Sequence, residues 1–367
     1  MDTRAIARRM LTFALAFTLG VTGVNAQSPA DEAASAIIKL FDQYRVVMLG
    51  EMHESIQEHS LLNKLVTAPG FPERVNDIVV EACNALYQDT MDRYIAGEDV
   101  PAERLRPAWE NVVGAPGGIA VAPYHGLFAT IRSVNQRSPK NRQIRVLCGD
   151  PPIDWTRVET RDDIAPFLGF RDEHYASVVR YNVLALRRKA LLIMGSGHFQ
   201  RREGKPGVIE QQMIQAFTKP YVIVAGSNIV GTYDDLDARF QELPAPCLRE
   251  IKGSWLDELP RWQESPVIGF PAISAPKTKV GTWGQTADAY LYLGPRDELT
   301  QGGDAFDLEG TPYGSELRRR WRILFPKPPE ALPKSDGKEH PLFQRIAPLP
   351  PALPRVGGHA APRGEEK

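Results

Sequence analysis

The sequence predicts an α/β fold built on a mainly parallel sheet with helices on both faces. Short apolar runs rich in β-branched residues recur along the chain, which is typical of strands buried on both faces. Helical patterns separate these runs, and such alternation favours parallel strands joined by right-handed crossovers. A long stretch before the last run, 231–287, is too long for a plain connection, so we expect an inserted, lid-like segment there.

The predicted elements follow one another in a regular order. Apolar stripes at helical spacing lie between the predicted strands, and each stripe predicts the buried face of a helix. The predicted strands are 46–49, 78–80, 144–148, 191–194, 221–225 and 289–293. The stripes are Ile56, Leu62 and Val66; Leu127, Ile131 and Val134; Val178, Tyr181, Leu184 and Ala185; and Met213, Ile214 and Phe217.

The two ends of the chain differ from the predicted domain, 27–325. Residues 1–26 combine an arginine-containing start, an apolar stretch and a small-x-small site before Gln27, which predicts a secretory signal peptide. An uncleaved N-terminal anchor is the alternative. With the signal removed we expect a periplasmic or secreted protein without an integral membrane span. Residues 326–367 are rich in proline, which predicts a disordered tail.

Composition narrows the possible functions and partners. The 367 residues carry a net charge of −1 with a pI near 6.7, so a basic nucleic-acid binder is not expected. Three cysteines are too few for a disulfide scaffold. Cys83 and Cys148 both sit at strand ends and could pair if the strands are neighbours, which would leave Cys247 over. The oligomeric state is left open.

Titratable residues gather where the predicted strands end. The first strand runs into Glu51 and His53, the second reaches Glu81, the third Asp150 and the fourth His198. Ligands of open parallel sheets bind beyond the carboxyl ends of the strands. The sequence therefore predicts one site that contains these side chains.

Each of these residues also has a structural explanation. The histidines could be satisfied turn residues, and Glu51 could pair with Arg171, Arg180 or Arg201. His59 falls on the apolar stripe of its helix, so we expect it to pack in the core or behind the site. The functional interpretation is favoured because clustered titratable groups are costly to build for structure alone.

Three motifs resemble the signature of the erythromycin esterase, ChaN and Tiki superfamily. They are Gly50-Glu51-x-His53, the isolated Glu81 and Gly195-x-x-His198, and Arg171-Asp172 is a further echo. The resemblance covers about residues 45–230 and implies an α/β domain with these residues at its centre. Its branches include esterases, proteins that resemble metal-dependent peptidases, and haem-binding surface proteins. A macrolide substrate is therefore not implied.

Two histidines and two glutamates can activate a water in two ways. A histidine can accept the proton of water while a glutamate orients its other ring nitrogen. Alternatively Glu51, His53, Glu81 and His198 could ligate zinc, manganese or iron, which would lower the pKa of a bound water. Asp150, Arg171 and Ser196 are expected to contact substrate. Ser196 also stays open as a nucleophile, although a Gly-x-Ser-x-Gly elbow is absent from the sequence.

The sequence thus predicts an exported hydrolase with Glu51, His53, Glu81 and His198 as catalytic residues. We expect its substrate to be an ester or amide, either a small molecule or a peptide. No cofactor is required in the base scheme, and a divalent metal serves in the other. The alternative is a non-catalytic protein that binds haem or iron in the same cleft.

Overall fold

The computed structural model describes most of the predicted domain. The described residues are 27–114, 122–225, 238–240, 243–263, 278–295, 298–300, 302, 308–325, 328 and 332. The predicted signal peptide lies outside them, as does most of the predicted tail.

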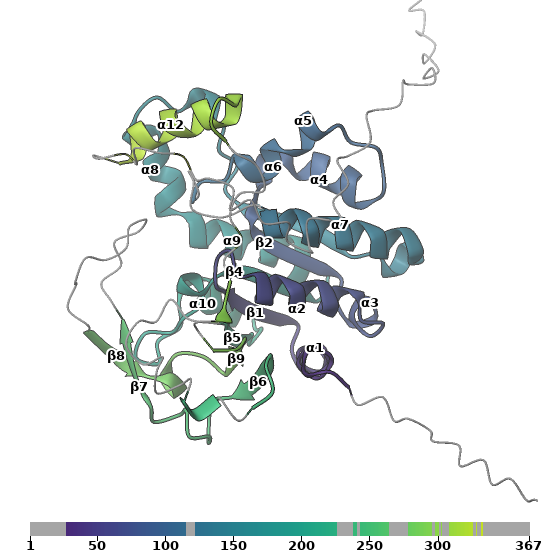
Figure 1. Ribbon diagram of the computed structural model, residues 1–367, viewed down its shortest axis with the longest axis vertical. Helices are drawn as coiled ribbons and strands as arrows, with labels where there is room; N and C mark the ends of the chain where they lie inside the picture. The colour runs from purple at the N-terminus through teal and green to yellow at the C-terminus, as the bar shows by residue number, and fades with distance from the viewer. Residues whose placement is uncertain are drawn as a thin grey trace, which may run out of the picture.

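The helices and strands alternate along the chain as far as β5 (Figure 1). The helices are α1 (Pro29–Leu40), α2 (Ile56–Thr67), α3 (Phe71–Arg74), α4 (Gln88–Ile95), α5 (Ala102–Leu105), α6 (Pro107–Glu110), α7 (Ala122–Arg137), α8 (Arg161–Gly169), α9 (Arg171–Val179), α10 (Val208–Gln215) and α12 (Pro312–Leu324). The strands are β1 (Val46–Glu51), β2 (Asp77–Asn84), β3 (Arg145–Asp150), β4 (Ala190–Gly195), β5 (Tyr221–Ala225), β6 (Cys247–Glu250), β7 (Pro260–Gln263), β8 (Thr278–Thr282) and β9 (Ala289–Tyr292).

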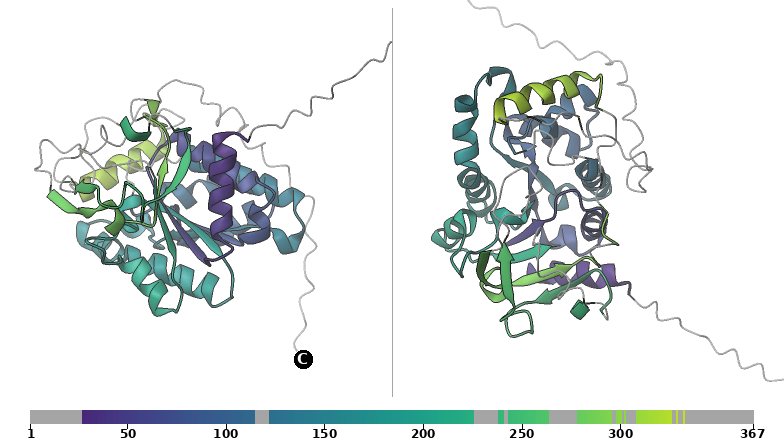
Figure 2. Two further views of the ribbon diagram at one scale, coloured as in Figure 1. Left: turned by 90° about the horizontal axis from the view of Figure 1, so that it is seen from below. Right: turned by 60° about the vertical axis from the view of Figure 1, so that its left-hand side comes forward.

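Seven strands form one sheet in the order β3-β2-β4-β1-β5-β9-β6. Every described pairing in it is parallel except the antiparallel pair of β6 and β9. The prediction of a mainly parallel sheet with helices on both faces is confirmed (Figure 2). The order brings the carboxyl ends of β3, β2, β4 and β1 side by side, and this edge holds the predicted site.

Each face of the sheet has its own apolar core. Side chains of α1, α2, α4 and α7 pack on one face, together with alternate residues of the strands such as Val47 and Leu49. Side chains of α9 and α10 pack on the other face, against the opposite alternate residues such as Val46 and Met48. Both faces of the central strands are therefore buried, which explains why their sequences are apolar without alternation.

Two predicted helical stripes are partly wrong. Tyr181 is 68% exposed, because α9 ends at Val179 and a π-helical turn, Arg180–Leu184, changes the direction of the following side chains. Phe217 is fully exposed, because α10 ends at Gln215 and Phe217 adopts a φ of 56°. Ile214 lies within α10 next to buried Met213 and is itself 47% exposed. Each predicted stripe therefore continues past the end of its helix, which is Val179 for α9 and Gln215 for α10.

The insertion before β9 contributes to the sheet. Its strand β6 extends the main sheet at the edge, and β7 pairs with β8 in a separate two-stranded antiparallel sheet. Buried Arg261 of β7 donates a hydrogen bond to Gln200, two residues beyond His198. The described part of the insertion thus contacts the loop after β4, while a lid over the site stays a prediction.

The chain packs beyond the predicted domain end. Leu332 is buried against Leu308, Leu317 and Trp321 of the α12 region. Packed structure therefore reaches at least Leu332, while the disordered tail stays a prediction for the residues after it. Among the described residues, no helix has the length and apolar character needed to cross a membrane.

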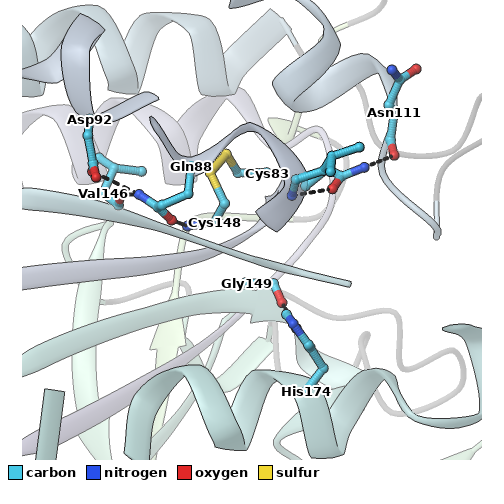
Figure 3. Close-up of a disulfide and its surroundings, with 10 residues drawn as sticks. Cys83, Gln88, Asp92, Asn111, Val146, Cys148, Gly149 and His174 are labelled. Atoms are coloured by element: carbon cyan, nitrogen blue, oxygen red, sulfur yellow. Dashed lines mark hydrogen bonds between the residues drawn. A yellow bond between two sulfur atoms is a disulfide. The ribbon is translucent and has the colours of Figure 1, made fainter. Parts of the chain in front are cut away.

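Cys83 and Cys148 form a disulfide, which settles the pairing left open by the sequence (Figure 3). The pair is possible because β2 and β3 are neighbouring parallel strands. The adjacent Gln88 side chain donates to the carbonyl of Val146 and accepts from the amide of Cys148. Cys247 remains a free thiol.

Candidate active site

The four predicted catalytic residues converge at the carboxyl edge of the sheet. Glu51 ends β1 and His53 follows it, Glu81 lies near the end of β2, and His198 lies in the turn after β4. His53 is bonded to Glu51, and the charges of Glu81 and His198 also act on its pKa. The structure therefore brings together all four residues that the sequence singled out.

Glu51 and His53 form a hydrogen-bonded pair. Nδ1 of His53 donates to Oε1 of Glu51 over 2.7 Å, and the carboxylate is fully buried. Burial alone would lower the pKa of His53, but the bond to Glu51 and the charge of Glu81 raise it to about 9. Burial likewise opposes the charge of Glu51, yet His53 and the nearby His59 lower its pKa.

Nε2 of His53 is the ring nitrogen that Glu51 does not bind. No described residue forms a hydrogen bond with Nε2, and the side chain is 33% exposed. A water or substrate at this nitrogen can therefore exchange a proton with it. Glu51 fixes both the orientation of the ring and the nitrogen that faces outward.

His198 is held from both sides by acids. Its Nδ1 donates to Oδ1 of Asp172 over 2.5 Å, and its Nε2 lies 3.4 Å from Oε1 of Glu81. Burial would lower the pKa of His198, but Glu81 and Asp172 raise it to about 9. His198 is therefore a cation at neutral pH, with both nitrogens engaged.

Arg171, the first residue of α9, links two buried acids. Its Nη2 donates to Oε1 of Glu81 and to Oδ1 of Asp150, each over 2.9 Å. Tyr175 and the backbone amide of Val113 also donate to Asp150. Arg171 thus pairs with these acids and not with Glu51. Substrate contacts of Asp150 and Arg171 stay predictions.

The charge of Glu81 is stabilised by several donors. Burial raises its pKa, but His198 and Arg171 outweigh that effect and hold the pKa well below its usual range. Its second oxygen accepts from the amide of Gly195 over 2.7 Å. Glu81 is therefore ionised, and it supplies the negative charge that keeps both histidines protonated.

Close backbone approach explains two glycines at this edge. A Cβ at Gly195 would lie 2.8 Å from Cε1 of His53, and one at Gly50 would lie 2.9 Å from Cα of Ser196. The Ser196 hydroxyl donates to the carbonyl of Gly50 over 2.8 Å, so it links β1 to β4. This contact disfavours Ser196 as a nucleophile, and its contact with substrate stays a prediction.

Three buried polar residues surround the second oxygen of Glu51. Nε2 of His59 lies 3.5 Å from Oε2 of Glu51, and the ring of Tyr124 meets the His59 ring edge-on at 4.8 Å. Glu58 accepts from the amide of Met52, and its pKa lies well above the usual range because of burial and the charge of Glu51. Burial and the neighbouring carboxylate thus favour the protonated form of Glu58, and Glu51 is the more acidic member of this pair.

The donor set does not fit a divalent metal. Oε1 of Glu81 faces the Arg171 guanidinium, Nδ1 of His53 is bonded to Glu51, and Nδ1 of His198 is bonded to Asp172. Within the described ranges, no group of three or more His, Cys, Asp or Glu side chains is arranged to hold a metal ion. The arrangement instead pairs each imidazole with a carboxylate.

The sequence did not single out Asp172, Glu58 or Tyr124 as members of the site. Asp172 stood in the Arg171-Asp172 motif, and its place in the first turn of α9 carries its carboxylate to His198. Glu58 lies in the first turn of α2, seven residues after Glu51, and this short separation could have indicated that the two carboxylates are close. Tyr124 has no comparable signal, because its position depends on how α7 packs on the sheet.

The fold and the site together define an α/β protein whose carboxyl sheet edge carries a cluster of paired carboxylates and imidazoles. No protein-family model and no curated protein matches the chain. Solved structures similar to it include a protein from Bacillus cereus, with 12% identity over 74% of this chain and 94% of that one and a TM-score of 0.48.

Two further solved structures belong to proteins that the sequence motifs resemble. A variant of the erythromycin esterase EreC in its open conformation is 12% identical over 73% of this chain and 94% of that one, with a TM-score of 0.47. ChaN of Campylobacter jejuni, in a structure of cofacial haem binding, is 16% identical over 54% and 87%, with a TM-score of 0.33. These similarities are too distant to assign a function to the site of this chain.

Proposed function

We propose that this chain is a hydrolase that activates water with the Glu51–His53 pair. The single observation that carries the proposal is the state of His53: a buried carboxylate holds Nδ1, and Nε2 has no hydrogen-bond partner in the described part of the chain. A general base needs this arrangement, because one nitrogen must be fixed while the other accepts a proton.

The proposed reaction attacks the carbonyl carbon of an ester or amide. Neutral His53 accepts a proton from water at Nε2 as the water oxygen bonds to that carbon. The carbonyl oxygen becomes an oxyanion, and the nearby cations His198 and Arg171 favour this negative charge. When the bond to the leaving group breaks, the imidazolium of His53 returns the proton to that group.

The haem-binding alternative is less well supported by this site. Within the described residues, the site brings together two ionised glutamates, two imidazoles and a guanidinium. These charges do not fit the apolar face of a porphyrin. A Soret absorbance band in protein purified from haem-supplemented medium would favour the alternative.

A panel of chromogenic esters and amides tests the proposal. We expect the purified chain to hydrolyse at least one of them and His53→Gln to lose this activity by about a hundredfold or more. Glu103→Gln, a substitution at an exposed residue, should keep the activity and serves as the control. Hydrolysis by His53→Gln at the rate of the parent would exclude His53 as the base.

We also propose that the protein is exported to the periplasm or secreted. The basic and apolar order of residues 1–26 supports this, and so does the Cys83–Cys148 disulfide, because disulfides persist in oxidising compartments. Mature protein from a bacterial host should begin at Gln27. N-terminal sequencing that finds Met1 on soluble protein would contradict export by cleavage.

A further inference from the structure

Four large apolar side chains are exposed near the amino ends of β4 and β5, the two strands on either side of β1. Tyr181 and Leu186 precede β4 and are 68% and 57% exposed, while Ile214 and Phe217 precede β5. Single exposed apolar residues are common on soluble proteins. Here, however, four of them belong to two short segments that lead into the same part of the sheet.

These segments lie close together. The helices α9 and α10 pack on the same sheet face (Figure 2). Arg180, which follows α9, donates to Gln212 of α10 over 3.4 Å. The strands that follow, β4 and β5, flank β1, so their starts are two strand spacings, or about 10 Å, apart. The four side chains therefore share one edge of the protein.

The charged residues in the two segments that carry the apolar side chains are cations. Residues 174–202 and 211–233 contain no Asp or Glu, and the exposed residues Arg180, Arg187 and Lys219 lie beside the apolar side chains. The acid that faces them from β2, Asp77, is buried and already bonded to Arg145 and Arg188. Two further acids at this edge, Asp288 and the exposed Glu250, lie beside Tyr221 at the start of β5. The apolar side chains are therefore bordered by cations from their own segments, while the acids lie towards β9 and β6.

We propose that this edge docks the protein on an anionic lipid surface. Aromatic and aliphatic side chains can enter the headgroup region while arginine and lysine contact the lipid phosphates. A second copy of the chain is a poor occupant, because a symmetric contact would place the same cations against each other. The predicted catalytic residues lie at the opposite, carboxyl edge of the sheet, so docking would leave them facing away from the lipid.

Phe217 allows a test that spares the fold. Its φ of 56° is a conformation that glycine adopts freely, and its side chain is fully exposed. Phe217→Gly should therefore keep or raise the melting temperature while it removes the most exposed apolar group. Phe170→Ser is the matched control, because Phe170 is 65% exposed at the other end of α9.

The assay is co-sedimentation with vesicles of phosphatidylcholine, alone or mixed with phosphatidylglycerol. The parent protein should bind the mixed vesicles, and added salt should weaken the binding. Phe217→Gly should bind about tenfold more weakly, and Arg187→Gln and Lys219→Gln about fivefold each, while Phe170→Ser should bind like the parent.

Three outcomes would overturn the proposal. The first is no binding to mixed vesicles, and the second is equal binding to vesicles of phosphatidylcholine alone. The third is unchanged binding by Phe217→Gly and by both charge variants. Competition by duplex DNA that abolishes vesicle binding would likewise assign the edge to a different partner. None of these results depends on the hydrolase proposal.

Discussion

Replacing Glu51 with glutamine should lower the pKa of His53. In the parent protein the 2.7 Å bond to Glu51 and the charge of Glu81 outweigh burial and raise that pKa to about 9. An amide at position 51 can still accept the hydrogen bond, but it carries no charge. The pKa of His53 should then move towards its ordinary value near 6.5.

The size of the effect on catalysis follows from the fraction of neutral His53. With a pKa of about 9, roughly 1% of the His53 population is neutral at pH 7 and about half at pH 9, so base-dependent activity should rise about fiftyfold between these two pH values. In Glu51→Gln this rise should shift to lower pH. Its maximum should fall, because the amide holds the ring less firmly.

Histidine titration by NMR measures this pKa without a substrate. The chain has 7 histidines, and His53→Gln identifies the resonance of His53. Glu103→Gln should leave the titration unchanged, because that residue is exposed and lies on α5. A parent His53 that titrates near 6.5, or a pKa that stays at about 9 in Glu51→Gln, would refute the reasoning.

Three further predictions concern stability. Because His53 and His198 have pKa values raised to about 9, the folded state binds more protons than the unfolded state between pH 6.5 and 9. The melting temperature should therefore fall as the pH rises through that window. A melting temperature that stays constant or rises would contradict the raised pKa values of the two histidines. Cys83→Ala removes a crosslink between residues 65 positions apart, so the free energy of unfolding measured by chemical denaturation should fall by about 4 kcal/mol. Reduction of the disulfide in the parent should lower it by the same amount. A chain that ends at Phe325 should have a free energy of unfolding about 1–3 kcal/mol lower than a chain that ends at position 340, because it lacks the buried side chain of Leu332. Equal melting temperatures of the two chains would show that this packing is unimportant.

The sequence predicts the central site well, because that site is built from strand ends. The first four apolar runs lead into titratable residues, and parallel strands carry such residues to one edge, so Glu51, Glu81 and His198 could be placed together from the sequence alone. The order of the strands could not be predicted, since it depends on crossovers that leave no periodic signal. β4, for example, lies between β1 and β2.

The partners of these residues were harder to predict. The substrate contact of Arg171 stays a prediction, whereas its pairing with two buried acids, Glu81 and Asp150, is seen only in the structure. The pairing of Asp172 with His198 and the raised pKa of Glu58 depend on how α9 and α2 pack on the sheet. Such distances and burial are properties of the packed structure and have no fixed spacing in the sequence.

The most direct test of the central claim is hydrolysis before and after chelation, with elemental analysis of the same samples. The account predicts that chelator leaves the activity of the parent unchanged, and that His53→Gln loses more activity than His198→Gln because His53 is the base. Contradiction would come from a stoichiometric metal that is missing in His53→Gln, His198→Gln and Glu81→Gln, with activity of the chelated parent restored by added zinc, manganese or iron.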